Sequence, residues 1–191
     1  MKTYRLKEIP EKYKTLSLDV ISLAKQLGDI KISRELRAQP KNNQSLQTIW
    51  DNVSAHWQNV FDEEAAIPDV SLWRGLYLTL NQRAYDALSQ AIGAEGEFLP
   101  MSIEGEHIYL FNCLTFGKEQ EELCIRTYID GMDVGGLDTL FFDEHDIQNK
   151  LLYKSLMEGA RKLFASEKFK ELYEQHNLQG LLFEEDLLAV F

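Results

Sequence analysis

The clearest pattern of hydrophobic and polar positions lies in residues 96–113. Leu99, Met101 and Ile103 recur at every second position, and a second apolar run ends at Cys113. A period of two is typical of a strand that buries one face. The Glu-Gly-Glu segment at 104–106 separates the two runs and places a glycine where a turn is needed. The pattern therefore predicts a β-hairpin in the middle of the chain.

A helical period predicts three helices. Residues 80–92 repeat apolar side chains at helical spacing after Thr79, which begins a Thr-x-x-Gln capping box. Ser166 is placed to cap a second helix, and Asn177 can end it in the left-handed conformation. The apolar residues of segment 46–61 recur at intervals of 3, 1, 3, 4, 3 and 1, which predicts the third helix.

Short apolar runs between turn-forming residues predict strands. These runs cover residues 3–9, 13–23, 72–78, 123–129 and 181–183. Residues 22–27 could instead form a short helix that Gly28 closes. Loops are predicted at 34–45, a polar run that Pro40 interrupts, and at 130–138, which holds three Gly and three Asp.

The predicted elements indicate an α+β fold in a single domain, with a small, mostly antiparallel sheet and packed helices. A further helix is expected to open with the carboxylates at 143–146 and to continue through residues 151–159. We expect residues 1–45 to form an N-terminal elaboration of strands and a loop. Residues 46–191 are expected to form the main domain.

Composition adds limits to this picture. With 191 residues, of which 45% are hydrophobic, the chain can bury a sizeable core. No apolar run approaches about 18 residues, and the charged start at residues 1–14 has no apolar signal region, so we expect a cytoplasmic protein. Cys113 and Cys124 are expected to be free thiols in a reducing compartment, although two cysteines could also form one disulfide.

The net charge of −11 is unevenly distributed. Residues 1–50 hold ten Lys/Arg and five Asp/Glu, whereas residues 51–191 hold ten Lys/Arg and twenty-six Asp/Glu, a net of +5 against −16. A body with this charge repels nucleic acid and membrane surfaces and attracts a basic protein. Solubility alone also explains an acidic composition, so charge does not decide between a binding function and none.

Recognisable catalytic motifs are absent. The sequence has no phosphate-binding loop, dinucleotide glycine fingerprint, nucleophile elbow or paired CxxC zinc motif. The densest group of candidate ligands is Asp143, Glu144, His145 and Asp146, downstream of the aspartates at 130–138. Carboxylates and imidazole can hold a metal, so one hypothesis is a small metal- or ligand-binding enzyme domain that uses residues near 130–146. The alternative is an acidic loop before a helix start, and we expect no catalytic residues, metal or cofactor.

The middle of the chain also resembles a known family. The segment 68–114 is similar to the immunity proteins of bacterial polymorphic-toxin systems, in particular immunity protein family 11, a domain of unknown function. The shared pattern is a strand, a capped helix, a Glu-Phe-Leu-Pro strand and a tyrosine-bearing strand with asparagine. Its carriers here are Thr79, Ala84, Leu88, Glu97, Phe98, Leu99, Pro100, Tyr109, Leu110 and Asn112.

The likeness extends to residue 185, because the helix after Ser166 and the run Leu-Gln-Gly-Leu-Leu-Phe at 178–183 resemble the family's closing segment. The loop at 117–122 departs from the family, in which an aspartate-rich stretch follows the asparagine strand. Residues 1–45 lie outside the likeness. The resemblance implies a non-enzymatic protein that binds and neutralises a cognate toxin domain, and it transfers no functional residues to this chain.

Exposed carboxylates are the candidates for contact with such a basic partner. Pro100 cannot donate to a strand ladder, so the first hairpin strand is expected at a sheet edge, or with that amide position facing outward. The turn at 104–106 would then be an exposed acidic tip. We expect no nucleic acid or membrane as a partner, and the oligomeric state is left open. The candidate partner-binding residues are Glu104, Glu106, Asp143, Glu144 and Asp146.

Overall fold

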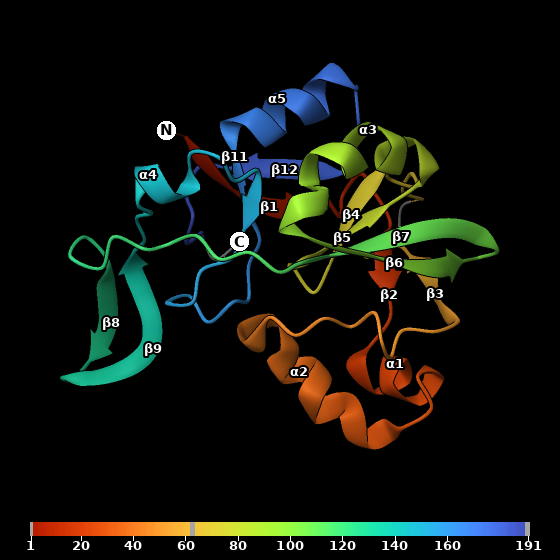
Figure 1. Cartoon of the computed structure of the whole chain (residues 1–191), viewed down its shortest axis with the longest axis horizontal. Helices are drawn as coiled ribbons and strands as arrows, with labels where there is room; N and C mark the ends of the chain where they lie inside the picture. The colour runs from red at the N-terminus through yellow and green to blue at the C-terminus, as the bar shows by residue number, and fades with distance from the viewer. Residues whose placement is uncertain (1, 62–63, 190–191) are drawn as a thin grey trace.

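The computed structural model describes residues 2–61 and 64–189, apart from the side chains of Asp133 and Val134. Its strands form two sheets and a separate two-stranded ribbon, with helices at both ends of the molecule (Figure 1). Among the described strands, only β3 and β6 pair in parallel, and every other ladder is antiparallel. The chain is an α+β protein, as its sequence pattern predicts.

The larger sheet has the strand order β2-β3-β6-β7-β5-β4. Its centre is the hairpin of β6 (Gly96–Ile103) and β7 (Glu106–Cys113), which pair along their whole length. Glu104 and Gly105 form the turn with φ values of 54° and 90°, the left-handed conformation that a two-residue hairpin turn requires. The predicted hairpin is confirmed. The other strands are β2 (Thr15–Ser17), β3 (Val53–Gln58), β4 (Val70–Trp73) and β5 (Tyr77–Leu80).

The smaller sheet has the order β10-β11-β1-β12. Its strands are β1 (Thr3–Glu8), β10 (Leu152–Tyr153), β11 (Phe164–Ser166) and β12 (Leu181–Glu184). The predicted first and last strands are therefore confirmed. Because β1 pairs with both β11 and β12, the N-terminal residues supply an inner strand to a sheet built from the C-terminal part of the chain.

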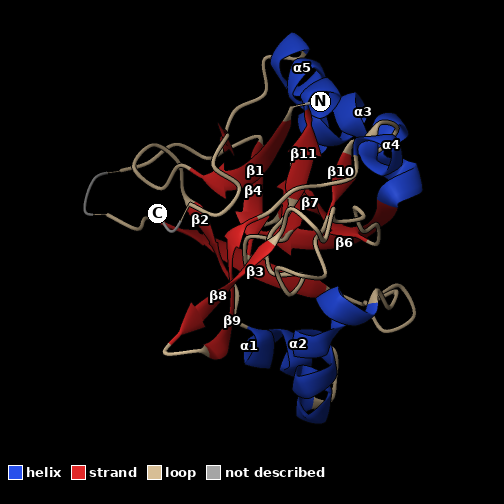
Figure 2. Ribbon diagram, turned by 90° about the vertical axis from the view of Figure 1, so that its left-hand side faces the viewer, coloured by secondary structure: helices blue, strands red, loops and turns tan. Residues whose placement is uncertain are grey.

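The helices lie in two groups (Figures 1 and 2). One end of the molecule holds α1 (Val20–Gln26), the short η1 (Ile30–Ile32) and α2 (Ser33–Asn42). The opposite end holds α3 (Gln82–Ile92), which runs into η2 (Gly93–Glu95), and α5 (Glu167–Gln175). The single-turn helix α4 (Glu144–Ile147) lies at the side of the smaller sheet.

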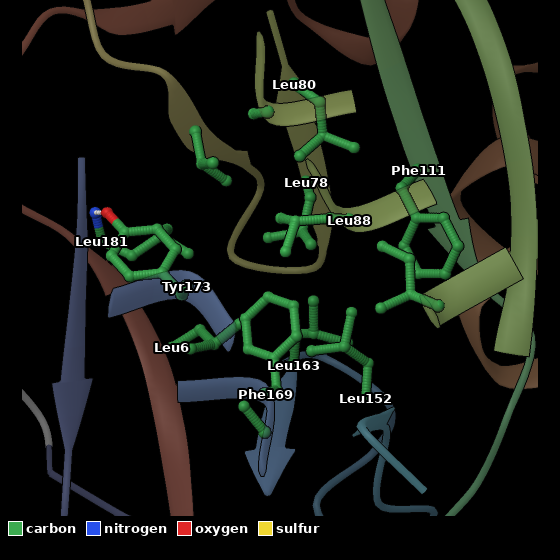
Figure 3. Packing of buried hydrophobic residues seen from close by; sticks show 14 of the residues in the cluster. Leu6, Leu78, Leu80, Leu88, Phe111, Leu152, Leu163, Phe169, Tyr173 and Leu181 are labelled. Carbon is green, nitrogen blue, oxygen red and sulfur yellow. Dashed lines mark hydrogen bonds between the residues drawn. The ribbon is translucent and has the colours of Figure 1, made fainter. Parts of the chain in front are cut away.

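The six-stranded sheet separates two cores. On β7, Leu110 and Phe111 are both fully buried, yet adjacent strand residues point to opposite faces. Phe111 packs in the cluster formed with α3, α5 and the smaller sheet, for example against Leu88 and Phe169 (Figure 3). Leu110 packs in the second cluster, with the side chains of α1 and α2 such as Leu23. The hairpin therefore organises both halves of the hydrophobic interior.

A two-stranded ribbon projects from this body. We call β8 (Ile125–Ile129) and β9 (Met132–Thr139) the β8–β9 arm. Figures 1 and 2 show the arm extending away from the two sheets. A third apolar cluster lies at its base, where Leu140 and Phe142 pack against Tyr153 and Phe164.

Two predictions at the start of the chain are wrong. Segment 46–61 forms β3 rather than a helix, because Asn52 takes a positive φ of 47° and the following residues pair with β2 and β6. Segment 34–45, predicted as a loop, forms most of α2. Pro40 lies in the last turn of α2 and cannot donate to the Leu36 carbonyl, so the helix forms with one hydrogen bond fewer. The buried side of α2 holds Leu36, Gln39 and Pro40, so only one large apolar residue marks it in the sequence.

The boundaries around α3 also differ from the prediction. The predicted strand at 72–78 is two strands, because Arg74 and Gly75 turn the chain with φ values of 58° and 70°. Thr79 lies inside β5, and Asn81 caps α3 by accepting the Ala84 N–H at 2.9 Å. The capping box at Thr79 is therefore wrong, although the helix itself is confirmed.

Two predictions in the second half fail because distant groups decide the local structure. The segment 130–138 turns only at Asp130 and Gly131, and most of the rest is β9, paired with β8. Residues 151–159 form β10 and turns instead of a helix. The buried carboxylate of Glu95 accepts the Leu151 and Leu152 N–H groups, which holds this segment against the end of α3.

Other local signals are confirmed. Asp143 caps α4, Ser166 caps α5, and Asn177 adopts a positive φ of 49° after α5. The short helix that could close at Gly28 is α1. Pro100 belongs to an inner strand, so the predicted edge strand is wrong.

Of the residues of β6, β3 pairs with Met101, Ser102 and Ile103, so Pro100 lies just outside that ladder. This agrees with the alternative prediction, in which the amide position of Pro100 faces outward.

Within residues 2–61 and 64–189, no helix combines the length and the apolar character that a membrane crossing requires.

Candidate functional site

The predicted partner-binding residues form two separate groups. Asp143, Glu144 and Asp146 lie on or beside α4, at the base of the β8–β9 arm. Glu104 and Glu106 lie at the tip of the β6–β7 hairpin. Figure 1 places α4 and the hairpin tip on opposite sides of the molecule. A single partner of ordinary interface size is therefore expected to contact one group and not both.

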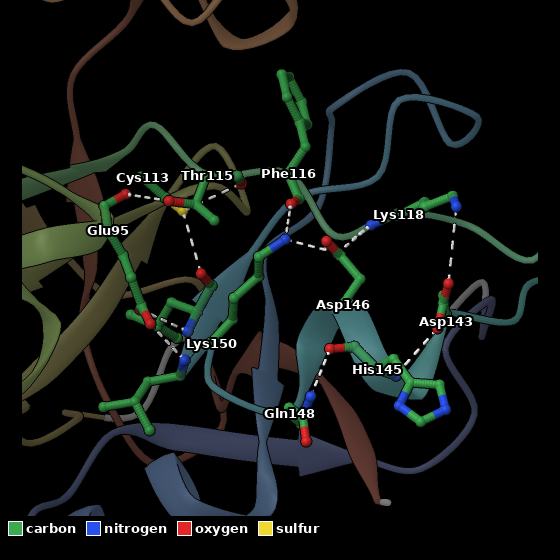
Figure 4. A network of polar contacts seen from close by, with 12 residues as sticks. Glu95, Cys113, Thr115, Phe116, Lys118, Asp143, His145, Asp146, Gln148 and Lys150 are labelled. Carbon is green, nitrogen blue, oxygen red and sulfur yellow. Dashed lines mark hydrogen bonds and ion pairs between the residues drawn. The ribbon is translucent and has the colours of Figure 1, made fainter.

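The carboxylates of α4 hold the loop beneath the helix. Asp143 caps α4 by accepting the His145 N–H at 2.9 Å, and it lies 3.7 Å from the Lys118 ammonium. Asp146 accepts the Lys118 N–H at 2.7 Å and the Lys150 ammonium at 2.5 Å (Figure 4). Partial burial opposes ionisation of Asp146, but these hydrogen bonds bring the pKa of its carboxyl below the ordinary value. Both aspartates therefore have structural partners.

The metal hypothesis has no support in the described part of the chain. No group of three or more His, Cys, Asp or Glu side chains is placed there to hold a metal ion. Asp130 and Asp138 lie at opposite ends of β9, and Asp138 accepts a hydrogen bond from the Thr127 hydroxyl at 2.7 Å. The side chain of Asp133, also part of this hypothesis, lies outside the described residues.

A groove of about 400 Å³ runs beside α4. We call it the acidic groove. Its floor is apolar, and it includes Phe141 and Leu187. Among the described residues that line it, four are acidic and none is basic. Glu185 and Asp186 were not predicted as site residues, because the C-terminal segment reaches this groove only through the tertiary fold. The lining residues are Thr3, Asp138, Thr139, Leu140, Phe141, Phe142, Glu144, Ile147, Glu185, Asp186, Leu187 and Leu188.

The β8–β9 arm continues this surface and exposes large apolar side chains. Ile125, Tyr128, Ile129 and Met132 are between 55% and 67% exposed. Ile129 and Met132 are paired directly across the two strands, so they lie on the same face. Ile125 lies at the other end of β8, beyond two register shifts of the ladder, and is exposed as well. Contiguous exposed apolar side chains of this kind mark interaction surfaces.

The arm also leaves backbone groups unpaired at its edges. Among the described strands, β8 pairs only with β9, and β9 only with β8. A two-stranded ribbon without a covering layer has marginal stability in water. A strand edge that no other strand covers can accept a strand from another chain through main-chain hydrogen bonds.

Charge is concentrated around the arm. Residues 119–146 hold nine Asp/Glu and only Arg126 as a basic residue, a net charge of −8. Such a field attracts a basic protein surface over about one Debye length, which is about 8 Å at physiological salt. The apolar face and the acidic surroundings together describe an interface with apolar anchors and a charged rim.

The hairpin tip is less well suited to this role. The Glu104 carboxylate accepts the Trp57 N–H at 3.2 Å, so it links the turn to β3. Glu106 is exposed beside it. Trp57 is partly buried against the core with α1. The tip is therefore acidic but lacks the contiguous apolar face of the arm.

The two cysteines are free thiols. Cys113 is buried in β7, and burial raises the pKa of its thiol to about 12, so it is no nucleophile at neutral pH. Cys124 is partly exposed just before β8, and its Sγ accepts the Phe141 N–H at 3.3 Å. Neither cysteine forms a catalytic pair in the described structure.

Comparison with known proteins adds no relatives. No model of a protein family matches the chain, and no curated protein matches it at a significant level. The likeness to immunity proteins is thus a prediction from the residues, and the argument for function depends on the geometry and charge of the arm.

Proposed function

We propose that this chain is a non-enzymatic, immunity-type protein that binds and neutralises a basic bacterial toxin domain in the cytoplasm. The observation that carries the proposal is the β8–β9 arm, which exposes apolar side chains within a segment of net charge −8. The resemblance at residues 68–185 supports the same function. The acidic groove beside α4 extends the surface that a partner would cover.

The arm provides both parts of a tight and selective interface. Ile129 and Met132 can bury apolar area against a partner on one face of the arm. Tyr128 lies on the other face and adds an aromatic side chain, and aromatic residues are frequent interface hot spots. The carboxylates around them raise the association rate of a basic partner and disfavour acidic proteins. An acidic protein on a basic catalytic cleft blocks substrate access without chemistry of its own.

Co-expression tests the proposal. The partner to co-express is sought among basic toxin-like domains encoded beside the gene for this chain, and the readouts are rescue of growth and a direct binding titration. We expect rescue, a stable complex, and an association rate constant that falls steeply as ionic strength rises. Absence of a complex and of growth rescue would contradict the proposed function.

Matched variants locate the interface. Tyr128→Ala with Met132→Ala truncates two exposed arm residues, and we expect a loss of affinity of about tenfold or more. Ile21→Ala with Ile30→Ala truncates exposed apolar residues on α1 and η1, outside the arm, and should leave affinity unchanged.

The hairpin tip is tested separately with Glu104→Lys and Glu106→Lys. We expect this charge reversal to change affinity far less than the arm variant does, because the tip lies on the other side of the molecule from α4. A larger loss from the tip variant would move the interface to the hairpin.

A further inference from the structure

Basic side chains gather in one groove of this acidic protein. The groove has a volume of about 500 Å³, and we call it the basic groove. Five cationic residues line it, together with two acidic ones, in a chain whose net charge is −11. The cationic residues are Arg5, Lys7, Arg74, Arg161 and Lys162.

Backbone hydrogen bonds bring these residues together from three segments. The Leu6 N–H donates to the Leu163 carbonyl at 3.0 Å, which sets β1 against the segment that follows Lys162. The Leu163 N–H donates to the Gly75 carbonyl at 3.1 Å, which sets the β4–β5 turn against the same segment. Residue 163 is buried. The cations are thus placed by the folded core and not by flexible surface loops.

Internal carboxylates compensate only part of this charge. Lys7 lies 3.8 Å from a Glu184 carboxylate oxygen. Arg161 and Lys162 share Glu158, at 3.9 Å and 3.5 Å. Neither Glu158 nor Glu184 is among the residues that line the groove.

Two arginines have no carboxylate partner among the described residues. The Arg5 guanidinium donates to the Ala189 carbonyl, and its buried Nε has no hydrogen-bond partner in the described structure. The Arg74 guanidinium lies 5.6 Å from the centre of the Trp73 ring. An unpaired buried donor is costly, so Arg5 lies at this groove with an incomplete set of hydrogen-bond partners.

The two carboxylates of the groove, Glu8 and Glu11, are fewer than its five cations. The Glu8 carboxylate accepts the Ser71 hydroxyl at 2.7 Å, and burial raises the pKa of its carboxyl. Burial and the neighbouring Arg5 and Arg161 lower the pKa of Lys162, despite its pairing with Glu158. The cations therefore repel one another across the groove, and a bound anion would relieve that repulsion.

We propose that the basic groove binds a phosphorylated small molecule, with its phosphate oxygens on Arg5 and Arg74. Guanidinium groups match phosphate oxygens in geometry and charge. Apolar side chains of the same groove, including Ile9 and Leu72, provide a surface for the rest of the ligand. A long polyanion such as nucleic acid would meet the repulsion of the acidic body, whereas a small anion feels mainly the local field.

Calorimetric titration of the purified full chain at low ionic strength tests this proposal. The probes are inorganic pyrophosphate, ATP and adenosine. We expect saturable binding of pyrophosphate or ATP with a dissociation constant below about 1 mM, and no binding of adenosine. ATP binding more tightly than pyrophosphate identifies a nucleoside phosphate as the ligand, and equal affinities identify the phosphate group alone.

Charge-matched variants assign the binding to the groove. Arg74→Gln changes an exposed turn residue, and it should weaken binding at least about fivefold. Arg5→Gln should do the same, with the melting temperature recorded to confirm folding. Arg37→Gln removes the same charge from an exposed position on α2 and should have no effect.

Two results would overturn the proposal. The first is no saturable binding of pyrophosphate or ATP by the wild-type protein. The second is binding that Arg74→Gln and Arg5→Gln leave unchanged, or that Arg37→Gln weakens equally. None of these outcomes depends on a toxin partner, so the groove and the proposed function can fail independently.

Discussion

Lys154 gives a sharp prediction about how stability depends on pH. Its side chain is only 2% exposed, yet it has no carboxylate partner among the described residues. Its ammonium donates to the Pro40 carbonyl at the end of α2 and to the Asn43 side-chain oxygen, both at 2.6 Å. It also lies 4.9 Å from the centre of the Phe116 ring. This residue links α2 to the C-terminal half of the chain.

The magnitude follows from the pKa of the buried amine. Burial lowers the pKa of Lys154 from 10.5 to about 8. Between these values the unfolded chain holds the proton that the folded protein has released, so the free energy of unfolding rises with pH. A difference of about 2.5 pKa units corresponds to about 3 kcal/mol.

Urea unfolding of the wild type and of Lys154→Met, from pH 7 to pH 10.5, measures this contribution. The difference in the free energy of unfolding between the two proteins isolates the contribution of Lys154, because the buried tyrosines and Cys113 titrate in both. We expect the wild type to gain about 3 kcal/mol relative to Lys154→Met over this range. A difference that stays constant with pH, or that changes in the opposite direction, would refute the reasoning.

Two further predictions concern the core. Gly180→Ala should cost more than about 3 kcal/mol in urea unfolding, because φ is +121° and a Cβ would lie 2.0 Å from the Val70 carbonyl oxygen. Gly105→Ala, also at a positive φ but with open space around it, should cost about 1 kcal/mol, and equal losses would contradict the clash. Native protein should react with a thiol reagent first at Cys124, and Cys113 should react only on unfolding. Rapid reaction of both thiols would contradict the buried position of Cys113.

The sequence predicts those elements whose signals are local. The hairpin at 96–113 combines alternation with a Glu-Gly turn, and both signals act within a few residues. Ser166 and Asn177 begin and end α5 through hydrogen bonds and backbone angles of their own segment. Such elements are specified before tertiary contacts form.

The wrong predictions share a different cause. Residues 151–159 have helical spacing, but Glu95 takes the N–H groups at the start of the segment. Segment 34–45 is polar and contains Pro40, yet it forms most of α2. The carbonyl of Pro40, in the last turn of that helix, accepts a hydrogen bond from the distant Lys154. These contacts join residues more than fifty positions apart, which periodicity within a short window cannot detect.

The candidate site was predicted in part. The acidic helix start at Asp143 is where the sequence places it. Its extension into a groove depends on Glu185 and Asp186, which the fold brings from the C-terminal segment. The apolar arm was not predicted. The glycines and aspartates of segment 130–138 are typical of a loop, whereas its pairing with β8 makes most of it a strand.

The most direct test of the proposed function is the affinity of the basic toxin-like domain chosen for co-expression for four proteins. These are the wild type, the arm variant Tyr128→Ala with Met132→Ala, the tip variant Glu104→Lys with Glu106→Lys, and the control Ile21→Ala with Ile30→Ala. We predict tight binding by the wild type and the control, a nearly unchanged affinity for the tip variant, and a loss of about tenfold or more for the arm variant. Full affinity in the arm variant would contradict docking through the β8–β9 arm, and no binding by the wild type would contradict the immunity function itself.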